Sequence, residues 1–228
     1  MPAGLVVVAL GGPTADTALL RARIAGATLT IAADAGALRL AELGLHADLL
    51  TGDFDSLSPA QRAAAERAGA TVVPHPDPQQ VTDCEAALRI AVQRDAEAVV
   101  ILGTHGGERL DHSLGNLLAL FQPRLAGIPM TVVSGWNEAV PLRAGGRAGV
   151  TFTGAPGDYV SVLALSDRVR TRTHALRWPL DDTVLARGDS RAISNELTGE
   201  RGGLELLEGA ALATHFFRPP ERVGGAPA

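Results

Sequence analysis

The feature that most constrains this fold is an alternation of short apolar runs with helix-like segments over the first 136 residues. Each run has the length of one buried strand, and the segments between the runs carry helix start and stop signals, such as Ser58-Pro59 and Gly44. The first helix is expected to start at a Thr14 cap. Strands that alternate with helices form a mainly parallel, doubly wound sheet with helices on both faces, which is an α/β fold. The expected strands are residues 5–10, 28–33, 47–50, 71–73, 98–102 and 130–133.

A different pattern begins near residue 137. Short β-like runs follow one another, Gly, Pro and Asp interrupt them, and no segment has a convincing helical period. The runs are residues 139–142, 149–152, 159–164, 183–185, 203–207 and 212–216. This pattern is typical of a small antiparallel sandwich or barrel, and we predict a β-sandwich domain at residues 137–217. Residues 218–228, rich in Pro and Gly, are expected to form a loose tail.

The charges narrow the classes of function. All 20 basic residues are Arg, so the chain lacks both the phosphate-binding lysine of a Walker loop and a Schiff-base lysine. Residues 1–140 hold 15 acidic and 9 basic residues, a net charge of −6. An acidic domain with few arginines argues against a nucleic-acid partner and suits a site that binds a cation first and phosphate through it.

The cysteine count, the apolar runs and the N-terminus indicate where the protein is expected to be located. The 228 residues include one cysteine, Cys84, which excludes an internal disulfide and fits a reducing cytosol. No apolar run reaches the roughly 18–20 residues of a membrane span, and the N-terminus has no basic signal-peptide region. We therefore expect a cytoplasmic protein with no membrane partner.

Two carboxylates stand close together in the stretch Gly52-Asp-Phe-Asp-Ser56, directly after an expected strand. In an extended or tightly turned backbone, Asp53 and Asp55 project to the same side. Like charges this close are unfavourable unless a cation lies between them. Since oxygen ligands suit a hard divalent cation, the pair predicts a Mg²⁺ site.

Other acids fall at the same edge of the predicted sheet. Asp34 ends the second strand, while Asp83 and Asp111 stand at the starts of helices before and after the fifth strand. In a doubly wound sheet, ligands bind outside the carboxyl ends of the strands, where helix N-termini also favour phosphate. Each acid can alternatively be a helix cap, and Thr82 with Glu85 matches a capping box. Their convergence nevertheless predicts a metal–phosphate site.

A glycine-rich loop after the fifth strand carries Arg109 and His112. The guanidinium of Arg109 can hold phosphate oxygens bidentately, or it can form a structural pair with Asp111. His112 can be a base or ligand, although a histidine at a helix start is more often structural. In the second domain, Trp178 can stack on a flat heteroaromatic ring or fill the core, and Ser194-Asn195 follow a Gly-Asp turn.

Taken together, these motifs resemble the thiamine pyrophosphokinase (thiamin diphosphokinase) family. The resemblance covers roughly residues 5–207, in family order. The matching pieces are Ala33-Asp-Ala-Gly36, Gly52-Asp-Phe-Asp-Ser56, Thr82-Asp83, Gly107-Glu-Arg-Leu-Asp-His112 with Leu114 and Asn116, Trp178, and Ser194-Asn195.

The resemblance implies transfer of the pyrophosphoryl group of ATP to the hydroxyl of thiamine, with release of AMP. It also implies a homodimer with active sites at the subunit interface. The α/β domain, residues 1–136, would bind ATP and Mg²⁺, and the sandwich would bind thiamine. The implied metal residues are Asp53, Asp55 and Asp83, and Arg109 and Asp111 complete the catalytic set. The implied ATP-side residues are Asp34, Thr82, Arg109, His112 and Asn116, and the implied thiamine-side residues are Trp178, Ser194 and Asn195.

Two positions depart from the family pattern. Family members often carry Lys-Asp where this chain has Gln79-Gln80, and Glu108 stands in a loop that is usually Gly-Gly-Arg. Two alternatives stay open. One is a pyrophosphokinase for another heterocyclic alcohol, such as a hydroxymethylpterin. The other is a nucleotide-binding sensor without turnover.

Overall fold

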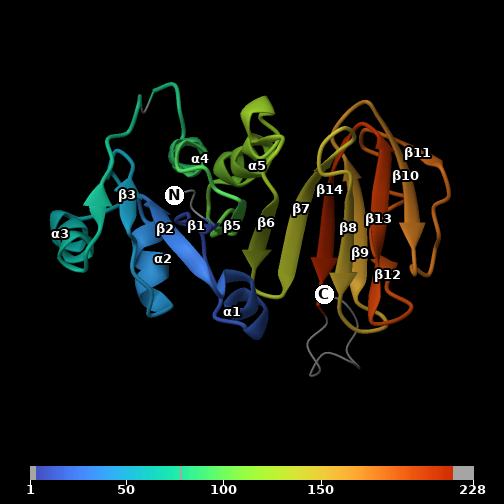
Figure 1. Ribbon diagram of the computed structural model, residues 1–228, viewed down its shortest axis with the longest axis horizontal. Coiled ribbons are helices and arrows are strands. Elements are labelled where there is room, and N and C mark those ends of the chain that lie inside the picture. The colour runs from blue at the N-terminus through green and yellow to red at the C-terminus, as the bar shows by residue number, and fades with distance from the viewer. Residues whose placement is uncertain (1–3, 78, 218–228) are drawn as a thin grey trace. The chain divides into compact units, whose positions relative to one another are not determined.

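The computed structural model describes residues 4–77 and 79–217 (Figure 1). The chain divides into two compact units between Gly135 and Trp136. The tail predicted at residues 218–228 lies outside the described residues. None of the helices described is long and apolar enough to cross a membrane.

The first unit contains a parallel sheet with the strand order β6-β5-β1-β2-β3-β4. Its strands are β1 (Leu5–Ala9), β2 (Ala27–Ala33), β3 (Leu49–Thr51), β4 (Thr71–Val72), β5 (Ala98–Leu102) and β6 (Met130–Ser134). The predicted parallel sheet is confirmed. The central strands β1 and β5 are buried almost throughout, which explains why they read as continuous apolar runs.

Helices cover both faces of this sheet. They are α1 (Ala18–Ile24), α2 (Gly36–Glu42), α3 (Pro59–Arg67), α4 (Asp83–Gln93) and α5 (Leu110–Ala119), with a 3₁₀ turn at Pro123–Leu125. Figure 1 shows α1 and α2 on one side of the sheet and α4 and α5 on the other. Apolar residues of α1 and α2, including Leu20, Ile24 and Leu40, pack on the strands.

The strand order creates a switch point between β1 and β5. From β1 the chain proceeds outward through β2, β3 and β4, and it then returns to β5 on the other side of β1. The loops after these two strands are joined, because Leu10 N donates to Leu102 O (2.9 Å) and Gly12 N donates to Gly103 O (3.0 Å). Ligands of doubly wound sheets bind at such a point.

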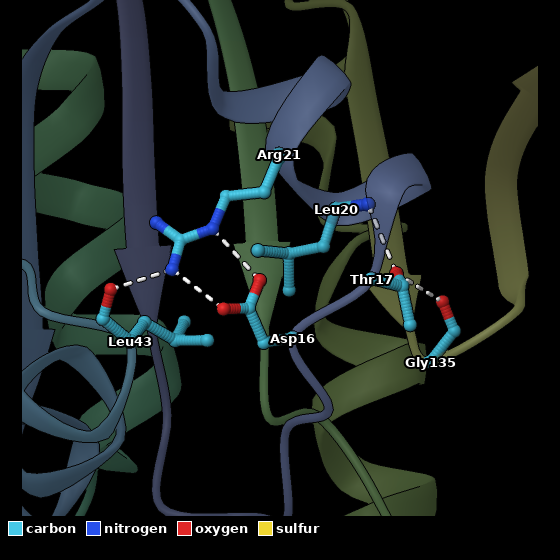
Figure 2. A network of polar contacts seen from close by, with 6 residues as sticks. All are labelled: Asp16, Thr17, Leu20, Arg21, Leu43 and Gly135. Carbon is cyan, nitrogen blue, oxygen red and sulfur yellow. Dashed lines mark hydrogen bonds and ion pairs between the residues drawn. The ribbon is translucent and has the colours of Figure 1, made fainter.

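Polar contacts at the start of α1 tie together three parts of the first unit (Figure 2). The cap is Thr17 rather than the predicted Thr14, whose hydroxyl instead donates to Gly12 O. The Thr17 hydroxyl accepts from Leu20 N (3.2 Å) and donates to Gly135 O (2.9 Å) just after β6. Arg21 pairs bidentately with Asp16 and donates to Leu43 O (2.7 Å) at the end of α2.

The second unit consists of two antiparallel sheets, with the orders β12-β9-β14-β7 and β11-β10-β13-β8. Apolar residues of both sheets share one core, which confirms the predicted sandwich. The strands are β7 (Asn137–Arg143), β8 (Gly149–Thr153), β9 (Tyr159–Ala164), β10 (Arg168–His174), β11 (Thr183–Ala186), β12 (Asn195–Glu196), β13 (Arg201–Glu208) and β14 (Ala210–Phe216).

Strand β10 has no counterpart among the runs expected from the sequence. Its sequence, RVRTRTH, has one aliphatic residue, yet it lies between β11 and β13 in its sheet. Val169 and Thr171 point into the core, and the Thr171 hydroxyl donates to Glu205 O (2.9 Å). Arg170 and Arg172 pair with acidic residues of the loop before β11, so charge pairing replaces an apolar pattern on this strand's other face.

We expect Thr17→Ala to lower the free energy of unfolding by about 1–2 kcal/mol, because it removes both a helix cap and a hydrogen bond to Gly135. Urea denaturation checks this value. Thr17→Ser keeps the hydroxyl and should retain most of the stability, whereas equal stability of the Ala variant would show that the network is not stabilising.

Candidate active site

A cavity of about 430 Å³ lies in the first unit where strands β1, β2 and β3 end. It is therefore located at the carboxyl edge of the sheet, beside the switch point. Its lining residues are Leu10, Gly11, Ala33, Asp34, Ala35, Asp53, Asp55, Ser56, His75, Val81, Thr82, Asp83, Cys84, Arg109, His112 and Asn116.

Three carboxylates converge in this cavity. Asp34 follows β2, Asp53 follows β3 and Asp83 is the first residue of α4. Each offers one oxygen, and the three oxygens lie within 4.8 Å of one another. Carboxylate oxygens grouped in this way match the ligand preference of a hard divalent cation.

The backbone that presents these carboxylates is strained. Asp34 and Phe54 have φ angles of 46° and 62°, which residues other than Gly rarely adopt. Gly36 closes the same turn, because a Cβ there would lie 1.9 Å from the Ala9 carbonyl oxygen. Gly52, with φ 141°, places the next loop against Asp34. The sequences Asp-Ala-Gly and Gly-Asp-Phe-Asp thus bring Asp34 and Asp53 together.

The electrostatics of the cluster favour a cation. Burial, followed by the charges of Asp34 and Asp53, raises the pKa of Asp83 to about 6. Burial also raises the pKa of Asp34, although Ser56 N donates to its Oδ2 (3.3 Å). The other oxygen of Asp34, Oδ1, is buried and has no hydrogen-bond partner among the residues described. An orphaned oxygen between two further carboxylates fits a Mg²⁺ ligand.

Asp55 lies in the same cavity but outside this group of three. Its carboxylate accepts from the Ser56 hydroxyl (2.9 Å), and its backbone N–H donates to Asp53 Oδ1 (3.2 Å). The family resemblance implies Asp53, Asp55 and Asp83 as metal residues, and the structure groups two of these, Asp53 and Asp83, with Asp34. The difference arises because the turn at Phe54 separates Asp55 from its neighbour.

Helix α5 brings the glycine-rich loop to the cavity. Arg109, His112 and Asn116 line the cavity, and Asn116 is held by its Nδ2, which donates to Thr104 O (3.0 Å). Asp111 is not a lining residue, and its carboxylate forms a bidentate pair with Arg109 (2.9 and 2.7 Å). This hydrogen-bonded pair holds the pKa of Asp111 well below its usual range.

The start of α4 is capped by one side chain. Thr82 accepts from Glu85 N (3.3 Å), as half of the predicted capping box. The Glu85 carboxylate instead pairs with Arg89 (2.6 Å) and Arg124 (3.2 Å). Thr82 therefore fixes Asp83 in the first turn of α4 at the cavity wall.

The loop between β4 and α4 holds a residue that the sequence did not single out. His75 lines the cavity, and its Nε2 lies 3.5 Å from Asp83 Oδ1. The sequence gives no signal for His75, because no other potential metal ligand stands at a recognisable motif spacing from it. Gln79 and Gln80, which replace the usual Lys-Asp, are exposed, and both form hydrogen bonds to the Asp77 carboxylate rather than line the cavity.

A separate pocket of about 340 Å³ lies in the second unit and is lined by Trp178, Arg191, Ile193, Ser194 and Asn195. The structure thus brings together the three residues predicted on the thiamine side. The Trp178 ring is half-exposed and not part of the sandwich core. Ser194 has a φ of 61°, so strain is present here as it is in the first cavity.

Two neighbours fix Trp178 in this pocket. The buried amide of Asn195 donates to Trp178 O and accepts from Trp178 N (3.0 Å) and Glu196 N (2.9 Å). The Arg177 guanidinium lies 4.9 Å from the Trp178 ring centroid and pairs with Glu196. Since both lone pairs of its amide oxygen are used, Asn195 acts mainly by holding Trp178.

Comparisons with known proteins identify the family to which both units are similar. The family profile "Thiamin pyrophosphokinase, catalytic domain" matches residues 20–132, and "Thiamin pyrophosphokinase, vitamin B1 binding domain" matches residues 150–206. A thiamine pyrophosphokinase of Bacillus subtilis is 27% identical over 183 residues, which are 80% of this chain and 84% of that protein.

Solved structures share the fold across both units. The thiamine pyrophosphokinase structure from Bacillus subtilis has a TM-score of 0.80 and 24% identity, covering 95% of this chain and 100% of that one. The thiamin pyrophosphokinase structure from Geobacillus thermodenitrificans has a TM-score of 0.76 and 27% identity, covering 95% and 99%. With both family domains matched in order, this chain belongs to the thiamine pyrophosphokinase family.

Proposed function

We propose that this protein transfers the pyrophosphoryl group of ATP to the hydroxyl of thiamine and so produces thiamine diphosphate and AMP. The observation that carries this proposal is the convergence of Asp34, Asp53 and Asp83 in the cavity at the switch point. Membership of a family whose matched domains are described as catalytic and vitamin B1 binding supports the choice of reaction.

Transfer of a phosphoryl-type group depends on positioning and charge neutralisation more than on covalent help. Asp34, Asp53 and Asp83 would hold Mg²⁺, which, when bound, neutralises phosphate charge. Thr82, His112 and Asn116 line the same cavity and are proposed to contact ATP. Asp55, beside the cluster, is proposed to complete the acidic wall, either directly or through water.

Arg109 supplies positive charge from the α5 side of the cavity. In the structure its guanidinium is paired with Asp111, and both side chains are exposed. A phosphate oxygen would compete with Asp111 for this fork. Since Asp111 pairs bidentately with Arg109 and does not line the cavity, we assign it the orientation of Arg109.

We place thiamine against Trp178 in the second-unit pocket, with Ser194 at its edge. Arg177 lies over the Trp178 ring, which leaves the opposite face for a flat ring of thiamine. Asn195 contributes by holding the Trp178 backbone on both sides.

We also propose that the protein is a homodimer with active sites at the subunit interface. Leu110, Leu114 and Leu118 are 70%, 53% and 58% exposed, and they recur every four residues along α5. Residues with this spacing form one stripe, and an exposed apolar stripe marks an interaction surface. The same helix carries His112 and Asn116 into the cavity, so a second copy packed on the stripe would fix a wall of the ATP site.

A cytoplasmic location completes the proposal. Cys84 is the only cysteine and is buried. Burial raises the pKa of its thiol to about 12, so it stays protonated and unreactive. A single buried thiol, with no second cysteine to form a disulfide, is typical of proteins in the reducing cytosol.

The test of the proposed reaction is AMP release in the presence of ATP, Mg²⁺ and thiamine. We expect AMP and thiamine diphosphate in equal amounts, and no AMP without thiamine. Formation of AMP with 6-hydroxymethyl-dihydropterin but not thiamine would favour the other pyrophosphokinase. ATP binding without AMP formation would favour the sensor.

The Asp53→Asn variant should lose turnover by roughly 100-fold or more, because it removes one charge from the proposed cation site. Steady-state AMP release measures the loss, and circular dichroism checks that the variant is folded. Asp95→Asn is a matched control, since Asp95 lies outside the cavity and Asn tolerates its φ of 52°. Unchanged turnover of Asp53→Asn would exclude Asp53 as a metal contact.

Cation binding should depend on pH through Asp83. Its raised pKa of about 6 means that a proton occupies the site at pH 5 and must leave when the cation binds. We therefore expect the apparent affinity for Mg²⁺ to be about 10-fold weaker at pH 5 than at pH 7. The same shift adds to the stability of the metal-free protein as the pH falls through 6. Isothermal titration at the two pH values tests this, and equal affinities would contradict it.

Leu114→Asp should convert the proposed dimer into monomers, because it introduces a charge in the middle of the leucine stripe. Sedimentation velocity gives the oligomeric state. Ala64→Asp, on the exposed side of α3, is the control and should remain dimeric. A dimeric Leu114→Asp protein would place the interface elsewhere.

A further inference from the structure

His75 is buried at the wall of the acidic cavity without a satisfied imidazole. Only 4% of its side chain is exposed, and both ring nitrogens are buried with no hydrogen-bond partner among the residues described. Buried polar atoms are normally paired, and exceptions gather at functional sites. The nearest charged group is Asp83, whose Oδ1 lies 3.5 Å from His75 Nε2.

This position suits a donor to Asp83 better than a metal ligand. The three oxygens that lie within 4.8 Å of one another come from Asp34, Asp53 and Asp83, and no nitrogen of His75 belongs to the group. A neutral imidazole has one N–H, and a donor at Nε2 would turn one oxygen of Asp83 toward the ring. The other oxygen would then remain directed at the cation.

A hydrogen-bond donor beside Asp83 also suits the cavity, because an outer N–H that orients a ligating carboxylate supports a metal site. The other histidine of the cavity, His112, belongs to α5 and not to the loop that approaches Asp83. The chain has no lysine that could take this place.

We propose that His75 is a positioning residue, which donates a hydrogen bond from Nε2 to Asp83 and so holds this carboxylate in place for a divalent cation. This inference rests on the proposed function, because it assigns the cation to the Asp34–Asp53–Asp83 cluster. It concerns the affinity for the metal and not the proton transfer of the reaction.

The experiment measures Mn²⁺ binding to the nucleotide-free protein, using the electron paramagnetic resonance signal of unbound Mn²⁺. His75→Phe keeps a ring of similar size without a donor, and should weaken Mn²⁺ affinity about 10-fold or more. His75→Gln keeps an N–H near the position of Nε2 and should stay within about 3-fold of the unmodified protein. His46→Phe, an exposed histidine outside the cavity, is the control and should bind normally.

The outcomes separate the inference from the proposed function. If His75→Phe binds Mn²⁺ as tightly as the unmodified protein, or if His75→Gln loses as much affinity as His75→Phe, the positioning role is wrong. The reaction itself stands in both cases as long as thiamine-dependent AMP release persists. If the unmodified protein does not bind Mn²⁺ while Asp53→Asn has full turnover, the cation site fails together with this inference.

Discussion

The gathering of three carboxylates in one cavity is the constraint on which the site of the first unit depends. Asp34, Asp53 and Asp83 come from separate parts of the chain, and their oxygens lie within 4.8 Å of one another. Burial and mutual charge raise the pKa of Asp83 to about 6, so the metal-free cluster is poorly matched to neutral pH. In the proposed function, a divalent cation with its bound phosphates would relieve this mismatch at the place where phosphoryl chemistry requires charge neutralisation.

Fixed backbone conformations hold the three carboxylates together against their mutual repulsion. Left-handed conformations at Asp34 and Phe54 and the close approach of Gly36 to β1 fix two of the three acids, while the Thr82 cap fixes the third. The sheet contributes the common edge at which these turns meet. In the second unit, Ser194 likewise has a left-handed backbone, and the Asn195 amide holds the backbone of Trp178.

Sequence reasoning succeeded where the signal was local. Buried strands such as β1 and β5 are continuous apolar runs, and Asp34, Asp53 and Asp83 stand directly after strands or at a helix start, so their shared edge follows from parallel topology. It failed where a side chain's role depends on distant partners. The arginines of strand β10 pair with acidic residues of a later loop, Thr17 caps α1 and also donates to Gly135 O, and the environment of His75 exists only after α4 is in place. Which carboxylates approach one another most closely could likewise not be predicted from residue spacing, since the left-handed turn at Phe54 is a property of the folded backbone.

The central claim is that the cation and the phosphates meet at these three carboxylates. The most direct measurement is a crystal structure of the complex with Mn²⁺ and a non-hydrolysable ATP analogue, using the anomalous signal of manganese to locate the ion. We expect a manganese peak coordinated by Asp34, Asp53 and Asp83, with analogue phosphate oxygens completing its ligand shell. A bound analogue whose manganese lies away from these carboxylates would contradict it.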